Sequence, residues 1–290
     1  MKRIWRRFRP RTIVATETSD DDVFSRARKL IDNAVAGVPR RLWRRHDASI
    51  YDGAIDSLRS RATTENDVAF WVAALVLQAP RAVAAQRQMD KHQHGYRNKQ
   101  ARLFELIDFN DTYVTTVLAL PEQHLAVFDS RVRAMMNDIC ARLRLPGFSD
   151  EQWQAITMGL SREIAVYRGA RLLGYRARMT SRVEDAMGVD MVVTNSDDES
   201  INLDIKTRSS FHFRLMDLER EGRISHLELE QGEKFGHLTV INGHGHESVR
   251  TTLLRIDEET YGRTTNYSLE RLEPLRDSLE QIVASVRNHQ

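Results

Sequence analysis

The chain has 290 residues, of which 41% are hydrophobic and 29% charged, which is ordinary usage for a globular protein. This composition excludes collagen-like, low-complexity and wholly disordered chains, and the length allows two domains. The net charge of +2 hides an asymmetry, because residues 1–150 carry 25 basic and 18 acidic side chains whereas residues 151–290 carry 18 and 23. A basic first half is typical of a protein that binds an anionic partner.

The single cysteine, Cys140, cannot form an intramolecular disulfide, which excludes a secreted disulfide scaffold and favours a cytoplasmic protein. The longest apolar run, Val68–Leu77, is shorter than the roughly 20 residues of a membrane-spanning helix, so we expect a buried core helix and no membrane partner. Residues 1–22 lack the apolar segment of a signal peptide and are interpreted as a basic flexible arm. The alternative is an organellar transit peptide, because no acidic residue precedes Glu17.

Residues 23–148 have the apolar periodicity of helices and are expected to form an all-helical domain that binds nucleic acid or a partner. The expected helices are Val23–Ala36, Asp47–Arg61, a third that Thr64 or Asn66 caps and that runs toward Gln88, Gln100–Leu118 and Glu122–Leu143. Pro146 and Gly147 end this pattern and place the domain boundary at residue 148.

Residues 149–290 alternate between helical and strand patterns. Ser149 and Gln152 match a capping box at the start of a helix, and Gly174 ends that helix. The expected elements are the helix Asp150–Leu173, strands Tyr175–Thr180, Gly188–Thr194 and Ile201–Thr207, a helix Phe213–Glu221, strands His237–Asn242 and Thr252–Asp257, and a closing helix that Ser268 caps. The chain is therefore expected to be α+β overall, with an all-helical domain followed by an α/β domain on a central mixed sheet.

Charged residues occur where this α/β domain should be apolar. In Ile201–Thr207 alternate side chains point to opposite faces, so Asp204 and Lys206 share the face opposite the three apolar residues. Asp190 opens the preceding apolar strand, where a charge is costly unless it is paired or bound to a cation. An antiparallel hairpin would bring Asp190 near the Asp204–Lys206 end. Glu163 interrupts the apolar stripe of the preceding helix, so a third carboxylate is expected near the sheet.

Three carboxylates and a lysine at one sheet edge suit metal-assisted hydrolysis of a phosphodiester, because hard oxygen ligands bind Mg²⁺ and a lysine can act on water and phosphate. The alternative is an ordinary surface salt bridge between Asp204 and Lys206. The pattern Glu163, Asp190, Asp204 and Lys206 resembles the active-site signature of the PD-(D/E)XK nuclease superfamily, whose members have a restriction-endonuclease-like fold. Val189 stands where the motif has proline.

This resemblance covers about residues 149–260 and leaves residues 1–148 unmatched. It implies that Asp190, Asp204 and Glu163 hold one or two Mg²⁺ or Mn²⁺ ions. It also implies that all three are catalytic together with Lys206.

Arginines supply candidate contacts to nucleic acid. Arg40, Arg41, Arg44 and Arg45 flank Trp43, a mixture that suits phosphate contacts with aromatic stacking, although a solvated helix end would have the same composition. Two more follow the Asp204–Lys206 strand, where they could contact phosphate or neutralise nearby acids. These two are Arg208 and Arg214.

The sequence therefore favours a metal-dependent DNA endonuclease, with DNA expected ahead of RNA as the substrate. A nucleic-acid-binding protein that has a nuclease-like fold but does not cut, and an RNA-cleaving nuclease, are the alternatives. A homodimer is compatible with the sequence. Phosphate-binding glycine loops and the G-x-S-x-G element of hydrolases do not occur, so a nucleotide-dependent reductase, an NTPase and a serine hydrolase have no support.

Overall fold

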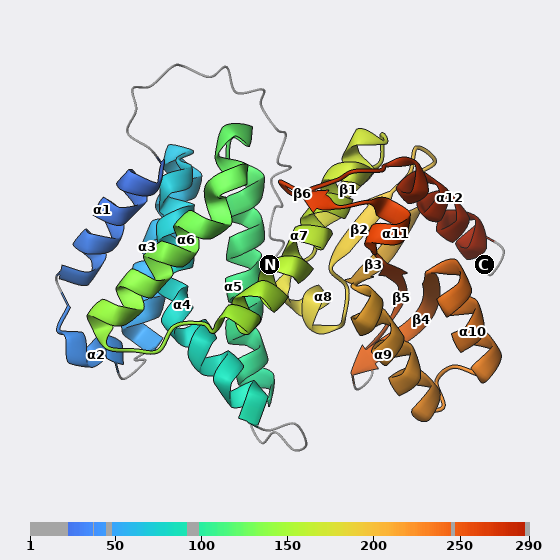
Figure 1. The fold of residues 1–290 in the computed structure, drawn as a ribbon, viewed down its shortest axis with the longest axis horizontal. Helices are drawn as coiled ribbons and strands as arrows, with labels where there is room; N and C mark the ends of the chain where they lie inside the picture. Colours follow the sequence, from blue (N-terminus) through green and yellow to red (C-terminus); the bar gives the residue numbers. More distant parts are fainter. Residues whose placement is uncertain (1–22, 37, 45–47, 92–98, 245–246, 288–290) are drawn as a thin grey trace, which may run out of the picture.

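The computed structural model describes residues 23–287 except for residues 37, 45–47, 92–98 and 245–246. A group of helices forms one half of the molecule, and a sheet with its covering helices forms the other (Figure 1). The predicted α+β fold with a central mixed sheet is confirmed. The predicted basic arm, residues 1–22, lies outside the described residues.

The helical half surrounds one long apolar helix. Its elements are α1 (Val23–Ala36), α2 (Arg40–Arg44), α3 (Ala48–Glu65), α4 (Val68–Lys91), α5 (Lys99–Ala119) and α6 (Glu122–Leu143). The long apolar helix is α4. Its segment Val68–Gln88 is long and apolar enough to cross a membrane by length and composition, but 78% of its apolar stretch is buried inside the protein. Packing of α1, α3, α5 and α6 around α4 accounts for this burial.

The start of α4 differs from the prediction. Neither Thr64 nor Asn66 caps it: the Asp67 carboxylate accepts a hydrogen bond from the Ala69 N–H at 3.0 Å. Asn66 has a positive φ of 51° and separates α3 from α4 with a backbone conformation that asparagine tolerates.

The second half begins with α7 (Asp150–Leu172), and its capping box of Ser149 and Gln152 is present as predicted. The following elements are β1 (Arg176–Met179), α8 (Arg182–Ala186), β2 (Met191–Thr194), β3 (Ser200–Lys206), α9 (Arg208–Arg220), α10 (His226–Phe235), β4 (His237–His244), β5 (Glu247–Arg255), α11 (Glu258–Tyr261), β6 (Thr264–Thr265), β7 (Ser268–Leu269) and α12 (Glu273–Arg287). Ser268 does not cap the closing helix, because it lies in β7 and the helix begins at Glu273.

The central sheet has the strand order β1-β2-β3-β5-β4, in which β3 and β5 are parallel and the other neighbours antiparallel. The apolar residues of β3 face a core shared with α7 and α12, as the alternation predicts. On the opposite face, α9 and α10 pack through Phe211, Leu215 and Leu229. Asp204 aligns with Leu253 of that second core, so its side chain belongs to this opposite face.

The two halves share core residues across the predicted boundary at residue 148. Trp153, Leu160 and Ile164 of α7 belong to the core of the helical half, whereas Ala165 and the residues after it pack on the sheet. The β6–β7 hairpin also contributes Tyr267 to the helical core. The helix α7 and this hairpin therefore join the halves.

Candidate functional site

Asp190 is held at the start of β2 by backbone contacts to β3. Its N–H donates to the Leu203 carbonyl at 2.8 Å, and its Oδ2 accepts from the Ile205 N–H at 2.6 Å. Because Met191 pairs with Leu203 in an antiparallel register, Asp190 lies beside Asp204, as the hairpin predicts. This hydrogen bond fixes the Asp190 carboxylate beside the end of β3.

Gly188 lets the chain approach this point closely. It has a φ of +79°, and a Cβ at this position would lie 3.1 Å from Asn242 Nδ2 and 3.9 Å from Asp204 Oδ2. A side chain here would be strained by the backbone and crowded by the site.

Asp204 and Lys206 project from the end of β3, just before Thr207 caps α9. The Lys206 ammonium donates a hydrogen bond to Asp204 Oδ1. The Asp204 side chain is only 6% exposed and that of Lys206 27%, so the pair is not the solvated surface salt bridge considered as an alternative. Burying two charges costs desolvation energy that can exceed their mutual attraction. A purely stabilising role therefore does not explain why this pair is buried.

Burial and neighbouring charges raise the affinity of Glu163 and Asp190 for protons. Burial raises the pKa of Glu163 to about 7, and the charges of Asp185 and Asp204 add to this effect while Lys206 opposes it. Burial and the neighbouring Glu163 and Asp204 carboxylates likewise raise the pKa of Asp190. Glu163, Asp190, Asp204 and Lys206 are therefore close enough for their charges to affect one another. Residues that act together on one substrate must be neighbours in this sense.

Lys206 remains an ammonium. Burial lowers its pKa, but the attraction of Asp204 and Asp190 outweighs burial, so the pKa lies above its ordinary value. An amine in this state can donate hydrogen bonds and stabilise negative charge, and it is a poor proton acceptor.

Two further carboxylates reach the site. Asp185 lies on α8, and burial together with Asp204 raises its pKa to about 6 despite the opposing charge of Lys206. Asp111, on α5 of the helical half, raises the pKa of Glu163. The capping box of Ser181 and Glu184 could have revealed α8 in the sequence, but nothing local marks Asp111.

Asn242, 5% exposed, borders the site on β4. Its Oδ1 accepts hydrogen bonds from Arg214 at 3.3 Å and Arg223 at 3.2 Å. Arg214, one of the predicted phosphate contacts, thus lies near Gly188 and the carboxylates. Arg208 is exposed and pairs with Glu259 at 2.7 Å.

The arginine cluster of the N-terminal half does not join this site. Arg40, Arg41 and Arg44 are exposed on α2, at the far end of the helical half from β2, β3 and α8 (Figure 1). Arg45 lies outside the described residues. Trp43 is fully buried and packs edge-on against Tyr51, with ring centroids 4.7 Å apart. The predicted aromatic stacking on nucleic acid is therefore wrong for Trp43, because its ring fills the core.

A large cleft opens beside the carboxylates. It has a volume of about 1430 Å³, and Glu163, Asp185 and Asp190 line it together with Asp111. The remaining wall comes from α3, α4, α5, α7 and β1. The site is therefore formed by both halves of the chain.

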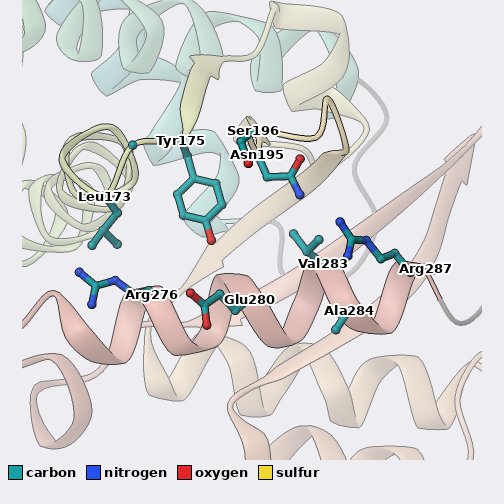
Figure 2. A pocket seen from close by; sticks show the side chains of 10 residues that line it. Leu173, Tyr175, Asn195, Ser196, Arg276, Glu280, Val283, Ala284 and Arg287 are labelled. Carbon is teal, nitrogen blue, oxygen red and sulfur yellow. The ribbon is translucent and has the colours of Figure 1, made fainter.

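A second cavity of about 420 Å³ lies between the end of α7, the β2–β3 turn and α12. Figure 2 shows the Tyr175 hydroxyl and the Glu280 carboxylate pointing toward each other across it. Arg287 on its rim is paired with Asp197 and Glu199. None of the predicted site residues lines this cavity.

The donor chemistry of the main site fits a hard divalent cation such as Mg²⁺ or Mn²⁺, which binds carboxylate oxygens. Glu163, Asp185, Asp190 and Asp204 share one lysine as an electrostatic neighbour, and burial, with the neighbouring carboxylates adding to it, raises the pKa values of the first three. Among the described residues, no three His, Cys, Asp or Glu side chains already stand in a metal-ligating arrangement. Glu163, Asp190 and Asp204 are the carboxylates that the resemblance assigns to an ion.

Comparisons with known proteins add no relative. No family model matches the chain, and no curated protein or solved structure matches it.

Proposed function

We propose that the protein is a divalent-metal-dependent nuclease that hydrolyses phosphodiester bonds of DNA. The observation that carries the proposal is the meeting of Asp190, Asp204 and Lys206 at adjacent strand ends, with Glu163 as an electrostatic neighbour, beside a large cleft. The resemblance to the PD-(D/E)XK superfamily supports it, because these residues occupy the positions of that superfamily's active-site pattern.

Each residue of the site would have a separate role in the hydrolysis of the phosphodiester. A bound Mg²⁺ or Mn²⁺ would lower the pKa of water and offset charge on the phosphate. Glu163 would ligate an ion or position the attacking water. The Lys206 ammonium can donate to a phosphate oxygen and stabilise the charge that develops there. Asp190, fixed by the Ile205 N–H, would help to hold the ion.

The test is cleavage of labelled DNA with Mn²⁺ or Mg²⁺ by the wild type and by Asp204→Asn and Lys206→Ala. Asp277→Asn and Lys234→Ala are matched controls, because both side chains are exposed on helices away from the site. We expect the two site variants to lose about 10²-fold or more in rate and the controls to retain the wild-type rate. Equal cleavage rates for all five proteins would contradict the assignment of Asp204 and Lys206 to an active site. DNA binding without any product would favour the non-catalytic alternative, and cleavage of RNA alone would favour a ribonuclease.

A further inference from the structure

The cleft beside the carboxylates suggests what kind of substrate reaches them. Its volume of about 1430 Å³ exceeds the roughly 300–1,000 Å³ of a small-ligand pocket. The helical half supplies one wall through α3, α4 and α5, and the α/β half supplies the other through α7, β1 and α8. A substrate must therefore enter between two walls to reach Glu163 and Asp190, instead of lying on an open face.

Several contacts tie the two walls of the cleft together. The Tyr267 hydroxyl, from the β6–β7 hairpin, lies 2.9 Å from the Tyr113 hydroxyl and 2.9 Å from Asp129 Oδ1 in the helical half. Helix α5 packs on α8, and α7 is shared by both cores. Arg168 of α7 also pairs with Glu122 of α6. Opening the cleft would break these contacts, so we expect its width to be fixed.

Besides its four carboxylates, the cleft is lined by aromatic rings and by Arg171, Arg176 and Arg178. Trp71 on α4 and Tyr167 on α7 are both half-buried and belong to opposite walls. The Arg171 guanidinium lies 5.7 Å from the centre of the Tyr167 ring, and its Nη1 donates to the Tyr167 hydroxyl at 3.0 Å. Arg176, on β1, is 68% exposed and can turn toward a phosphate from its surface pair with Asp198.

Unpaired bases can stack on aromatic side chains, while a basic groove follows the phosphates; this combination is typical of proteins that bind single strands. In a duplex the base faces are covered by their neighbours and only the base edges in the grooves are accessible. Two aromatic residues on facing walls therefore suit a single strand better than a duplex.

We propose that the cleft takes single-stranded DNA, or the unpaired strand of a branched DNA, with bases stacked on Trp71 and Tyr167 and phosphates near Arg171 and Arg176. This inference rests on the proposed nuclease function, because it assigns the strand that the carboxylates cut.

The experiment measures binding separately from cleavage. A labelled oligonucleotide of roughly 16 nucleotides is titrated with the protein in EDTA, as a single strand and as the blunt duplex of the same sequence. We expect the single strand to bind about tenfold more tightly. Trp71→Leu, which keeps an apolar side chain against the core, and Arg171→Ala should each weaken single-strand binding by about tenfold. Phe235→Leu and Arg220→Ala are the controls, since both residues are exposed outside the cleft.

Photocrosslinking provides a second readout that does not depend on folding changes in the variants. A single strand that carries 5-bromouracil should crosslink to peptides from α4 or α7 in the wild type. Equal affinity for duplex and single strand, crosslinks to α2 in place of the cleft, or weakening by Arg44→Ala but not by Trp71→Leu would overturn the inference. Tighter binding of RNA than of DNA would overturn the assignment to DNA.

The cleavage assay distinguishes failure of this inference from failure of the proposed function. Metal-dependent cleavage of duplex and single strand at equal rates would support the proposed nuclease but reject the preference for a single strand. Single-strand binding without cleavage would reject the nuclease function.

Discussion

The carboxylate cluster should make the ion-free protein less stable as the pH rises, and Glu163 is the residue that best exposes this effect. Its pKa rises from 4.5 to about 7 on folding, because burial disfavours the charged form. The folded state therefore binds a proton that the unfolded state has lost. This contribution to stability is fully present below pH 4.5 and is lost as the pH rises through about 7. At about 1.4 kcal/mol for each pKa unit, ionising Glu163 costs up to about 3 kcal/mol.

Glu163→Gln removes this cost, since the amide does not ionise. In EDTA at pH 8 we expect the variant to be more stable than the wild type by about 2 kcal/mol, after allowance for the partial exposure of the site, and near pH 4.5 we expect the two to be similar. Urea unfolding at both pH values measures the difference. Glu259→Gln is the matched control, because its side chain is 76% exposed in a surface pair with Arg208. A variant that gains no stability at pH 8 would refute the reasoning about the buried cluster.

Further changes test the other parts of the site and of the fold. Mn²⁺ should raise the melting temperature of the wild type more at pH 8 than at pH 6, because ligands must lose protons to bind, and Asp190→Asn should abolish this rise; a rise that is independent of pH would contradict a carboxylate site. Tyr267→Phe removes the hydroxyl that contacts both Tyr113 and Asp129 and should cost about 0.5–1.5 kcal/mol in urea unfolding, because Tyr113 and Asp129 remain paired with each other; an unchanged midpoint would show that these hydrogen bonds do not tie the two halves. Gly188→Ala should cost about 1–2 kcal/mol because of its positive φ and should lower the cleavage rate; full activity would argue against the close approach of Asn242 and Asp204. Trp43→Leu should cost a few kcal/mol without changing DNA affinity under conditions where the protein stays folded; a specific loss of DNA binding would restore its predicted contact role.

Much of the site could be predicted because its information is local. Alternation along β3 correctly separated Asp204 and Lys206 from the apolar face, and the short polar turn correctly implied that Asp190 would lie beside them. The interruption of an apolar helix by Glu163 was informative for the same reason, since a charge on a packed face requires a partner.

The errors come from tertiary packing that local patterns do not contain. Trp43 lies among arginines in the sequence, yet its ring is buried against Tyr51. Ser268 has the side chain of a helix cap, but the positive φ angles at Asn266 and Tyr267 form a hairpin that carries Tyr267 into the helical core.

The place of Asp111 beside Glu163 could not be predicted from the sequence either, because the fold brings α5 to the carboxylates from the other half of the chain. The cleft that gives the site its second wall is a product of the same packing. Local periodicity predicted the strands that carry the candidate site, whereas the surroundings that select a substrate needed the three-dimensional structure.

The most direct measurement of the central claim is the rate at which the purified protein cuts single-stranded DNA with Mn²⁺, compared with that of its Asp190→Asn variant. The amide introduced by this substitution would keep an oxygen for the Ile205 N–H but lose the negative charge. The proposed site predicts metal-dependent cleavage by the wild type and a loss of about 10²-fold or more in the variant. Equal rates for the two proteins, or no cleavage of any DNA by the wild type with either Mn²⁺ or Mg²⁺, would contradict it.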